Sequence, residues 1–411
     1  MLLVPTKLTA PQRNPLWVQR ERLLARLSAV HRARLTLLVA PAGFGKSTLG
    51  AQWLGAATES VAWLNLDEHD QDPLRFLAYV AGAIERVLPE VLRTARPLLS
   101  APEPPPLYVI LQALLVDLSV IPGGLTLVFD DYHSVTAEAI HQAVSYLLRH
   151  LPPTSHLVIL SRADPPFTLA RLGAEQQLTE LRAADLRFTY EEADAVVTSL
   201  VGQKVDRALV AALYEETEGW AIALQLAALT ALGAPHSPRS HRGSTVIAEY
   251  LAEEVFDRQP QALRDALLSL AVPERLSAGL AATLLGPPGD AIQAEHLLDQ
   301  LVRTNLFLAP LDGEGRWYRF HHLFRELLLR QLRLTADKQL VHTLHLRAAA
   351  WLEAEGLFEE AVRCYLAAGE ENAAGALIER LLAPDLGRSL SPIRPSYWLH
   401  LLPAPLIARR P

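Results

Sequence analysis

The residues best suited to bind a phosphate are 40–48, which read Ala-Pro-Ala-Gly-Phe-Gly-Lys-Ser-Thr. Glycines allow the backbone to turn so that successive N–H groups face phosphate oxygens, and a helix that starts at the lysine adds its dipole. The lysine supplies a charge to the β- and γ-phosphates, and the following hydroxyl is a ligand for Mg²⁺. The expected nucleotide-binding residues are Pro41, Ala42, Gly43, Phe44, Gly45, Lys46, Ser47 and Thr48, with Ser47 also on the metal.

A chance match to this pattern is the alternative, and Ala40 does stand where the phosphate-loop pattern usually has glycine. Lysine is rare in the chain, however, since besides Lys46 only Lys7, Lys204 and Lys338 occur. An apolar run at 35–39 precedes the loop and an amphipathic stretch follows it. This strand–loop–helix context favours a P-loop nucleotide site.

Two adjacent carboxylates, Asp130 and Asp131, end the apolar run that begins at Leu125. This is the position of a Walker B pair, in which Asp130 would hold Mg²⁺ and Asp131 would orient or deprotonate the attacking water. The competing interpretation is a strand that ends in a turn capped by aspartate. Because the chain also has a P-loop, we expect Asp131 to be catalytic and Asp130 to be a magnesium ligand.

A further apolar run, 156–161, ends at Arg162. In ATPases of the additional-strand type this strand lies between the Walker A and Walker B strands, and an arginine at its end can reach the γ-phosphate. The alternative is a surface arginine without a role. We expect Arg162 to act as a catalytic sensor of the γ-phosphate.

The elements that must position these residues form an α/β domain over residues 1–188. Apolar runs without alternation, separated by helical patterns, indicate a parallel sheet covered on both faces. The predicted strands are 35–39, 61–66, 125–131, 156–162 and 178–181. The fold class expected here is therefore an α/β P-loop NTPase of the additional-strand type, with a five-stranded parallel sheet.

The pattern becomes helical from Thr189 onward. We expect a helical subdomain over 189–232 and a linker rich in Pro, Gly and Ser over 233–245. Helices followed by a hairpin across 312–315 predict a winged helix over 246–335. Paired helices over 336–411 predict the start of a TPR-like solenoid. Because no polar capping helix closes it, we expect the chain to be a fragment or an early-terminated version of a longer protein.

Composition narrows the class of protein. The 411 residues are 50% hydrophobic and 20% charged, with a net charge of −7, which argues against a nucleic-acid coat. Cys364 is the single cysteine, so no intrachain disulfide is possible, and no secretion signal or bilayer-spanning run occurs. We expect a cytoplasmic protein without a membrane partner.

Taken in order, these motifs resemble those of the MalT-like regulators, a group within the STAND class of signal-transduction ATPases. Further matching stretches are Val-Gln-Arg-Glu at 18–21, Asn-Leu-Asp-Glu-His-Asp at 65–70, Leu-Arg-Phe at 186–188 and Glu-Gly-Trp at 218–220. Two positions depart from the usual pattern, since Gln19 replaces a glycine and Ala221 replaces a proline that contacts adenine.

The resemblance implies that Val18 and Arg20 bind the nucleotide and that His321, within Trp-Tyr-Arg-Phe-His-His-Leu-Phe at 317–324, approaches the ADP β-phosphate. It also implies a switch with a closed ADP state, an open ATP state and slow hydrolysis. A small-molecule or protein inducer would act on the helical repeats, and the ATP state would self-associate. The family typically ends in a LuxR-type DNA-binding domain that these residues lack, so contact with DNA is expected only through such a C-terminal domain.

Two other functions remain open at the level of sequence. One is a P-loop ATPase with continuous turnover, and the other is an interaction scaffold that does not respond to nucleotide. Turnover in the absence of an inducer separates the first from a switch, and substitution of Lys46 tests the second.

Overall fold

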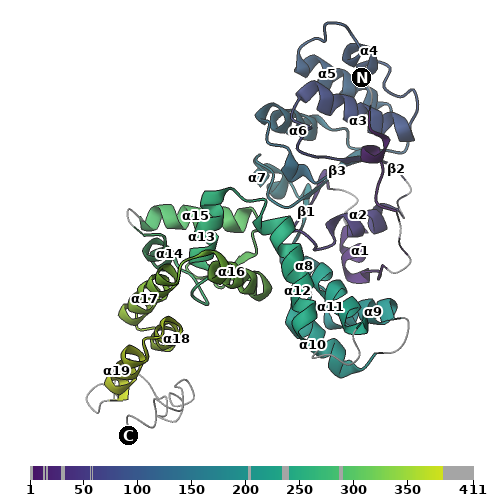
Figure 1. The fold of residues 1–411 in the computed structure, drawn as a ribbon. Coiled ribbons are helices and arrows are strands. Elements are labelled where there is room, and N and C mark those ends of the chain that lie inside the picture. Colours follow the sequence, from purple (N-terminus) through teal and green to yellow (C-terminus); the bar gives the residue numbers. More distant parts are fainter. Residues whose placement is uncertain are drawn as a thin grey trace. The chain divides into compact units, whose positions relative to one another are not determined.

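A computed structural model describes residues 3–12, 14, 17–28, 33–55, 57, 59–201, 205–233, 240–286 and 290–382. The chain divides into two compact units, residues 1–244 and 245–411. Each unit is described by itself. The elements carry the labels of Figure 1.

The first unit is built on a five-stranded parallel sheet with the order β2-β3-β4-β1-β5. Its strands are β1 (Leu35–Val39), β2 (Ser60–Asn65), β3 (Leu125–Asp130), β4 (Ser155–Ser161) and β5 (Leu178–Arg182). β4 pairs with both β1 and β3, so it lies between the strand before the P-loop and the strand that ends in the two aspartates. This order confirms the predicted additional-strand sheet.

Helices cover both faces of this sheet. The first unit contains α1 (Glu21–Ser28), α2 (Lys46–Leu54), α3 (Pro73–Val87), α4 (Ala95–Leu99), α5 (Leu107–Ser119), α6 (Glu138–His150), α7 (Ala170–Ala174) and α8 (Ala183–Leu186), and the 3₁₀ turns η1 (Pro5–Leu8) and η2 (Tyr132–Ser134). Leu35, Leu37 and Val39 of β1 join one apolar core with α3, α5 and α6. On the other face, Gly50 of α2 approaches Trp63 and Leu160. Burial on both faces explains why the strands are apolar throughout.

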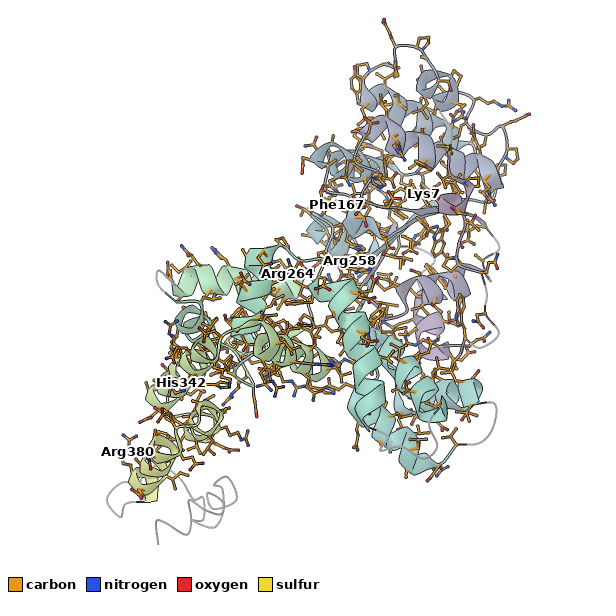
Figure 2. All side chains as sticks on the ribbon, viewed as in Figure 1. Lys7, Phe167, Arg258, Arg264, His342 and Arg380 are labelled. Carbon is orange, nitrogen blue, oxygen red and sulfur yellow. The ribbon has the colours of Figure 1, made fainter. Side chains whose placement is uncertain are left out.

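The N-terminal segment is tied to the edge strand β2. The amide of Asn65 donates to the carbonyls of Thr6, Lys7 and Thr9 at 3.4, 3.2 and 2.9 Å. The ammonium of Lys7, labelled in Figure 2, pairs with the fully buried Asp70. The segment therefore covers an edge that would otherwise be open to pairing with another strand.

Three helices follow the sheet: α9 (Tyr190–Val201), α10 (Arg207–Thr217) and α11 (Ala221–Gly233). They pack against one another as a small helical subdomain. Residues 234–239 of the predicted linker lie outside the described residues, and α12 (Ser240–Leu251) begins directly after them. A π-helical turn, η3 (Ala252–Phe256), continues α12.

The second unit holds a winged helix. Its elements are α13 (Gln261–Leu270), α14 (Ala278–Leu285), α15 (Ala291–Arg303), the antiparallel pair β6 (Leu308–Pro310) and β7 (Tyr318–Phe320), and α16 (His322–Thr335). The sequence predicts that the second of these helices starts at Leu276, whereas α14 starts two residues later. Ser277 caps it by accepting from the Leu280 N–H at 3.3 Å, and Leu276 instead forms a β-bridge with Tyr318.

Three consecutive helices end the described chain: α17 (Lys338–Ala354), α18 (Phe358–Ala368) and α19 (Glu371–Leu382). Contacts between them are local. His342 of α17 bonds to the Ala368 carbonyl at 2.9 Å, and Arg380 of α19 pairs with Glu353 of α17 (Figure 2). The TPR-like interpretation of this region stays a prediction, and its part beyond residue 382 lies outside the described residues.

The predicted fold class is thus confirmed for the P-loop sheet, the winged helix and the helical remainder. The domain boundaries stay predictions. The helix α6 was not predicted, although its apolar positions Ile140, Val144, Leu147 and Leu148 are buried in the core. Among the described residues, no helix is both long and apolar enough to cross a membrane.

Candidate nucleotide-binding site

The predicted P-loop connects β1 to α2 at the carboxyl edge of the sheet. Gly43 and Gly45 adopt positive φ angles of 74° and 75°, a region that L-residues with a side chain rarely enter. Gly45 is the N-cap of α2, so the loop opens directly onto the positive end of that helix. The backbone therefore has the shape needed to direct N–H groups at an anion.

Lys46 is held by the loop itself. The side chain is buried, and its ammonium donates to the carbonyls of Ala40 at 2.8 Å and Pro41 at 2.9 Å. Burial lowers the pKa of Lys46 to about 8, and the nearby carboxylates of Asp131 and Asp130 only partly offset that effect. A polyanion placed beside this ammonium would restore its pKa.

Ser47 and Asp130 lie together at the start of α2 and the end of β3. The Ser47 hydroxyl donates to Oδ1 of Asp130 at 3.0 Å, although the two residues are 83 positions apart. A hydroxyl and a carboxylate oxygen at this separation are hard oxygen donors of the type that Mg²⁺ prefers. The donor set at this point fits the predicted metal.

Burial, together with the adjacent charge of Asp131, raises the pKa of Asp130 to about 6. The bonds that Asp130 accepts from the Ser47 hydroxyl and from the Asp131 N–H, the latter at 2.9 Å, oppose the rise. A cation beside this carboxylate would favour its charged form.

Asp131 differs from its neighbour in exposure. Its side chain is 51% exposed, and its backbone has a φ of 54° in the left-handed region. A non-glycine residue in that region is uncommon and is typical of functional positions. The structure thus separates a buried carboxylate from an exposed one that solvent can reach.

Arg162 follows β4, the strand between β1 and β3. The positive charge of Arg162 lowers the pKa of Lys46, whereas the negative charges of Asp131 and Asp130 raise it. The P-loop lysine, the Walker B pair and Arg162 therefore share one electrostatic neighbourhood, as the strand order predicts.

A cavity of about 250 Å³ adjoins the loop. The predicted binding residues that line it are Val18, Arg20, Gly43, Gly45 and Thr48. Its other walls come from the segment before α1, from α2, from the segment between α8 and α9, and from α9 and α11. These lining residues are Asn14, Trp17, Leu49, Gln52, Phe188, Val196, Leu200, Ala221, Ile222 and Gln225. A mostly apolar cavity beside a phosphate loop suits a nucleobase.

Arg20 is buried and makes several contacts away from the loop. Its guanidinium donates to the carbonyls of Leu186 at 2.9 Å and Arg187 at 2.8 Å. It also pairs with the carboxylate of Glu192 at 3.2 Å and lies 4.5 Å from the ring centroid of Phe188. These contacts join the segment before α1 to the start of the helical subdomain. That Arg20 also contacts nucleotide stays a prediction.

The helical subdomain is bonded directly to the P-loop. The indole of the buried Trp220 donates to the Ala42 carbonyl at 3.1 Å, and the Ile222 N–H donates to the Gly43 carbonyl at 3.0 Å. A Cβ added at Gly43 would lie 2.3 Å from Cγ2 of Ile222, so the two segments are in close contact. We call these two bonds the Trp220 latch.

Two stretches quoted for the resemblance hold the latch in place. Arg187 pairs with Glu218 at 2.7 Å, and the Phe188 N–H donates to the Gly219 carbonyl at 2.8 Å. Glu218 and Gly219 both have positive φ angles, so the chain turns sharply before Trp220. The Leu-Arg-Phe and Glu-Gly-Trp stretches thus form one structural unit.

Comparison with known proteins identifies relatives that align with most of this chain. It is 34% identical over 375 residues to the HTH-type transcriptional regulators MalT of Cronobacter sakazakii and of Yersinia enterocolitica. Each alignment covers 90% of this chain and 41% of the relative. The chain is related to the MalT regulators. It spans about two-fifths of the length of these curated relatives.

The MalT relationship extends to both units. Residues 252–340 match the family model of the MalT winged helix domain, which confirms the predicted winged helix. Among solved structures, the Walker-type ATPase of Pyrococcus abyssi aligns with 75% of this chain and 95% of its own, at 15% identity and a TM-score of 0.53. This likeness shows a shared fold.

His321, the predicted ADP-sensing residue, belongs to the region that matches the MalT winged helix domain. It is the N-cap of α16 and is buried. Its backbone N–H donates to the Phe307 carbonyl at 2.7 Å. Its ring stacks on the ring of His322, with the two ring centroids 4.9 Å apart. Its role toward a nucleotide stays a prediction.

The sequence did not predict most of the cavity walls. Val196 and Leu200 belong to α9 and Phe188 to the segment between α8 and α9, and as apolar residues they look like ordinary core positions. The position of Ala221 was the one available signal, since the resemblance places an adenine contact there, and Ala221 does line the cavity.

Proposed function

We propose that this chain is the nucleotide-binding switch of a MalT-like transcriptional activator of the STAND class. It alternates between a closed ADP state and an open ATP state, and slow hydrolysis resets it. The Trp220 latch is the observation that carries the proposal. Because the P-loop carbonyls of Ala42 and Gly43 are bonded to α11 and its preceding residue, a change in the loop on nucleotide exchange reaches the helical subdomain directly.

The residues take the following roles. Lys46 and the backbone N–H groups of residues 42–48 bind the phosphates, while Val18, Arg20 and the cavity walls bind the base and ribose. Ser47 and Asp130 hold Mg²⁺, which when bound neutralises phosphate charge. Asp131 orients or deprotonates the attacking water, and Arg162 reports the γ-phosphate.

The remaining parts of the switch rest on the relationship to MalT. His321 contacts the ADP β-phosphate in the closed state. A small-molecule or protein inducer acts on the helical repeats, and the ATP state self-associates in the cytoplasm. DNA is bound by a domain of the relatives that lies outside the aligned residues.

Nucleotide binding and single-turnover hydrolysis test this proposal. We expect Lys46→Ala to weaken ATP affinity by about 10- to 100-fold, because a charge-assisted contact contributes about 1.5–3 kcal/mol. Lys338→Ala, an exposed lysine at the start of α17, is the matched control and should leave affinity unchanged. Unchanged nucleotide binding and assembly in Lys46→Ala would support the scaffold instead.

Hydrolysis distinguishes a switch from a continuously turning ATPase. We expect Asp131→Ala to retain ATP and to slow single-turnover hydrolysis by about 100-fold, the lower end for loss of a general base. Asp257→Ala, with a 58% exposed carboxylate, is the control. Fast steady-state turnover of the wild-type chain without inducer would contradict the switch.

The assignment of His321 is tested by ADP release. We expect His321→Ala to release ADP faster while ATP release is unchanged, and His322→Ala to serve as the control. Equal ADP release rates in His321→Ala and the wild type would refute the role of His321.

A further inference from the structure

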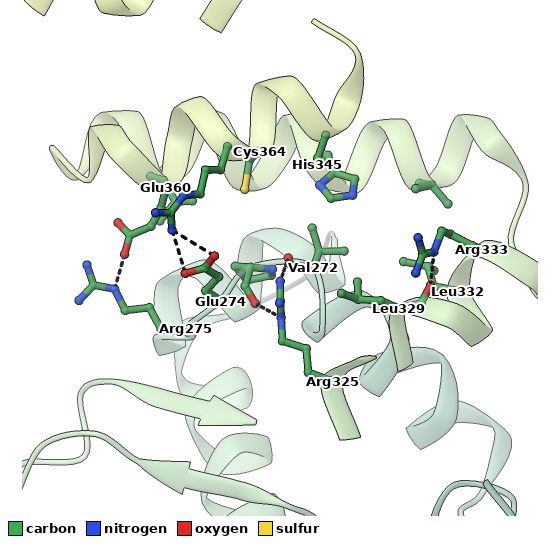
Figure 3. A pocket seen from close by; sticks show the side chains of 15 residues that line it. Val272, Glu274, Arg275, Arg325, Leu329, Leu332, Arg333, His345, Glu360 and Cys364 are labelled. Atoms are coloured by element: carbon green, nitrogen blue, oxygen red, sulfur yellow. Dashed lines mark hydrogen bonds and ion pairs between the residues drawn. The ribbon is translucent and has the colours of Figure 1, made fainter. Parts of the chain in front are cut away.

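A second cavity, of about 380 Å³, lies within the second unit, far along the chain from the P-loop. It is bounded by residues 272–275, by α16 of the winged helix, and by α17 and α18 (Figure 3). Its volume is within the range of about 300–1,000 Å³ that is usual for small-molecule sites. It is therefore large enough to hold a ligand that contacts all three helices.

The charged residues around this cavity leave an excess of positive charge. Four arginines and two glutamates line it. Glu274 pairs with Arg363 at 3.1 Å, and Glu360 pairs with Arg275 at 2.7 Å (Figure 3). Subtracting these two pairs from the six charges leaves Arg325 and Arg333, so the lining favours an anion.

Arg325 is the arginine oriented for recognition. Its Nε donates to the carbonyls of Ala271 and Pro273 at 2.9 and 3.0 Å, and its Nη2 donates to that of Val272 at 2.8 Å. These bonds to the carbonyls of residues 271–273 fix the guanidinium without neutralising its charge. A partly buried cation held in this way is costly unless an anion accompanies it.

The wall opposite Arg325 is polar but uncharged. In Figure 3, His345 of α17 and Cys364 of α18 project toward the space above Arg325. Burial, together with the charges of Arg325 and His342, lowers the pKa of His345, so its ring is neutral near pH 7. Among the described residues, no hydrogen-bond partner of its buried Nδ1 is found. Burial raises the pKa of Cys364 to about 12, so its thiol stays protonated.

Apolar side chains complete the cavity. Leu329 and Leu332 of α16 and Val341 and Leu352 of α17 line it. They would bury an alkyl chain, whereas a free phosphate or sulfate would gain nothing from them. The lining thus combines one oriented cation, one available imidazole and an apolar wall.

We propose that this cavity binds a small carboxylate with an apolar chain. The carboxylate lies between Arg325 and His345, and the chain packs on the leucines and valine of α16 and α17. Because the ligand contacts α16, α17 and α18 together, it stabilises the packing of the winged helix on the helices that follow it. This proposal is independent of the nucleotide switch.

Isothermal titration of the full chain with octanoate tests the proposal, with octanamide as the neutral isostere and inorganic phosphate as the anion without a chain. We expect saturable one-to-one binding of octanoate, at least tenfold weaker binding of octanamide, and none of phosphate. Equal affinity for octanoate and octanamide would overturn the carboxylate site, and binding of phosphate at the octanoate affinity would overturn the apolar part.

Two kinds of variant locate the binding. Arg325→Ala should abolish octanoate binding, but it also removes the hydrogen bonds to the carbonyls of residues 271–273 and can impair folding. Ala367→Trp avoids that problem, since Ala367 lies exposed at the rim and a bulky side chain there blocks the cavity. Ala376→Trp, at an exposed position of α19 outside the lining, is the matched control. Wild-type octanoate affinity in Ala367→Trp would show that the ligand binds elsewhere and refute the site.

Discussion

The ionisation of Asp130 should reduce the stability of the first unit when neither metal nor nucleotide is bound. Asp130 is 3% exposed as a residue, and the pKa of its carboxyl is raised from 3.8 to about 6. At 1.36 kcal/mol per pKa unit, holding the group charged at pH 7.5 costs about 3 kcal/mol relative to the unfolded chain. Asp130→Asn removes that cost and retains an oxygen that can accept from Ser47.

The expected gain is smaller than the full cost of ionisation. The new amide nitrogen is buried without an assigned partner, which costs about 1 kcal/mol. We therefore expect Asp130→Asn to stabilise the first unit by about 2 kcal/mol at pH 7.5, or about 4–8 °C in the midpoint of its thermal transition. The same substitution should weaken Mg²⁺-dependent ATP binding, since a neutral amide is a poorer ligand than a carboxylate.

The pH dependence follows from the direction of the shift. Because the folded-state pKa is raised, the destabilisation is fully present above about pH 6 and is relieved as the pH falls toward 4. At pH 5 the cost of ionisation is about half its value at pH 7.5, so the advantage of Asp130→Asn should fall below about 1 kcal/mol.

Asp117→Asn is the matched control. Asp117 is also 3% exposed, but its carboxylate accepts from the Thr94 N–H at 3.0 Å and the Ala95 N–H at 2.8 Å. An asparagine at this position would place an NH₂ group, which can only donate, against one of the backbone N–H donors. The substitution should therefore destabilise the same unit by about 1–3 kcal/mol. Scanning calorimetry without metal or nucleotide checks both, because Asp117→Asn identifies the transition of the first unit. A lower or unchanged midpoint for Asp130→Asn at pH 7.5 would refute the reasoning.

Three further predictions concern the loop. Binding of ATP at pH 8.5 should take up roughly three-quarters of a proton as Lys46 regains its charge, and titration in buffers of different ionisation enthalpy checks this; uptake below about 0.2 proton would contradict it. Trp220→Phe should lower the stability of the first unit by about 1 kcal/mol, because it leaves the Ala42 carbonyl without its indole donor, and a wild-type urea midpoint would show that the bond contributes nothing. Gly43→Ala should cost about 2–4 kcal/mol through its positive φ and its overlap with Ile222, and a double-mutant cycle with Ile222→Ala should show a coupling of about 1–3 kcal/mol; strict additivity would argue against the overlap.

Local sequence was sufficient for much of the site. The glycines of the loop, Lys46 and Ser47 are adjacent in the chain, and their spacing demands a specific backbone path. The two aspartates were placed correctly because strands buried on both faces are apolar throughout, so a carboxylate pair marks where such a strand ends. The strand order also followed, since the additional strand between β1 and β3 agrees with the predicted position of Arg162.

The helical parts were less predictable in detail. The helix α6 was missed, and Leu276 was assigned to a helix although it pairs with Tyr318 across the winged helix. Periodicity reports which residues can be buried, but it does not report which neighbour buries them. The start of α14 depended on the Ser277 cap, a local signal that an apolar pattern conceals.

The sequence by itself determined the chemistry of the loop, because residues 40–48 and 130–131 carry their phosphate and metal donors within short stretches. Only the tertiary structure decided what surrounds that chemistry. The bond from Trp220 to Ala42 spans 178 residues, and the cavity at Arg325 is closed by helices from two parts of the second unit. Such contacts depend on how apolar faces pack, and many sequences with the same pattern could pack them differently.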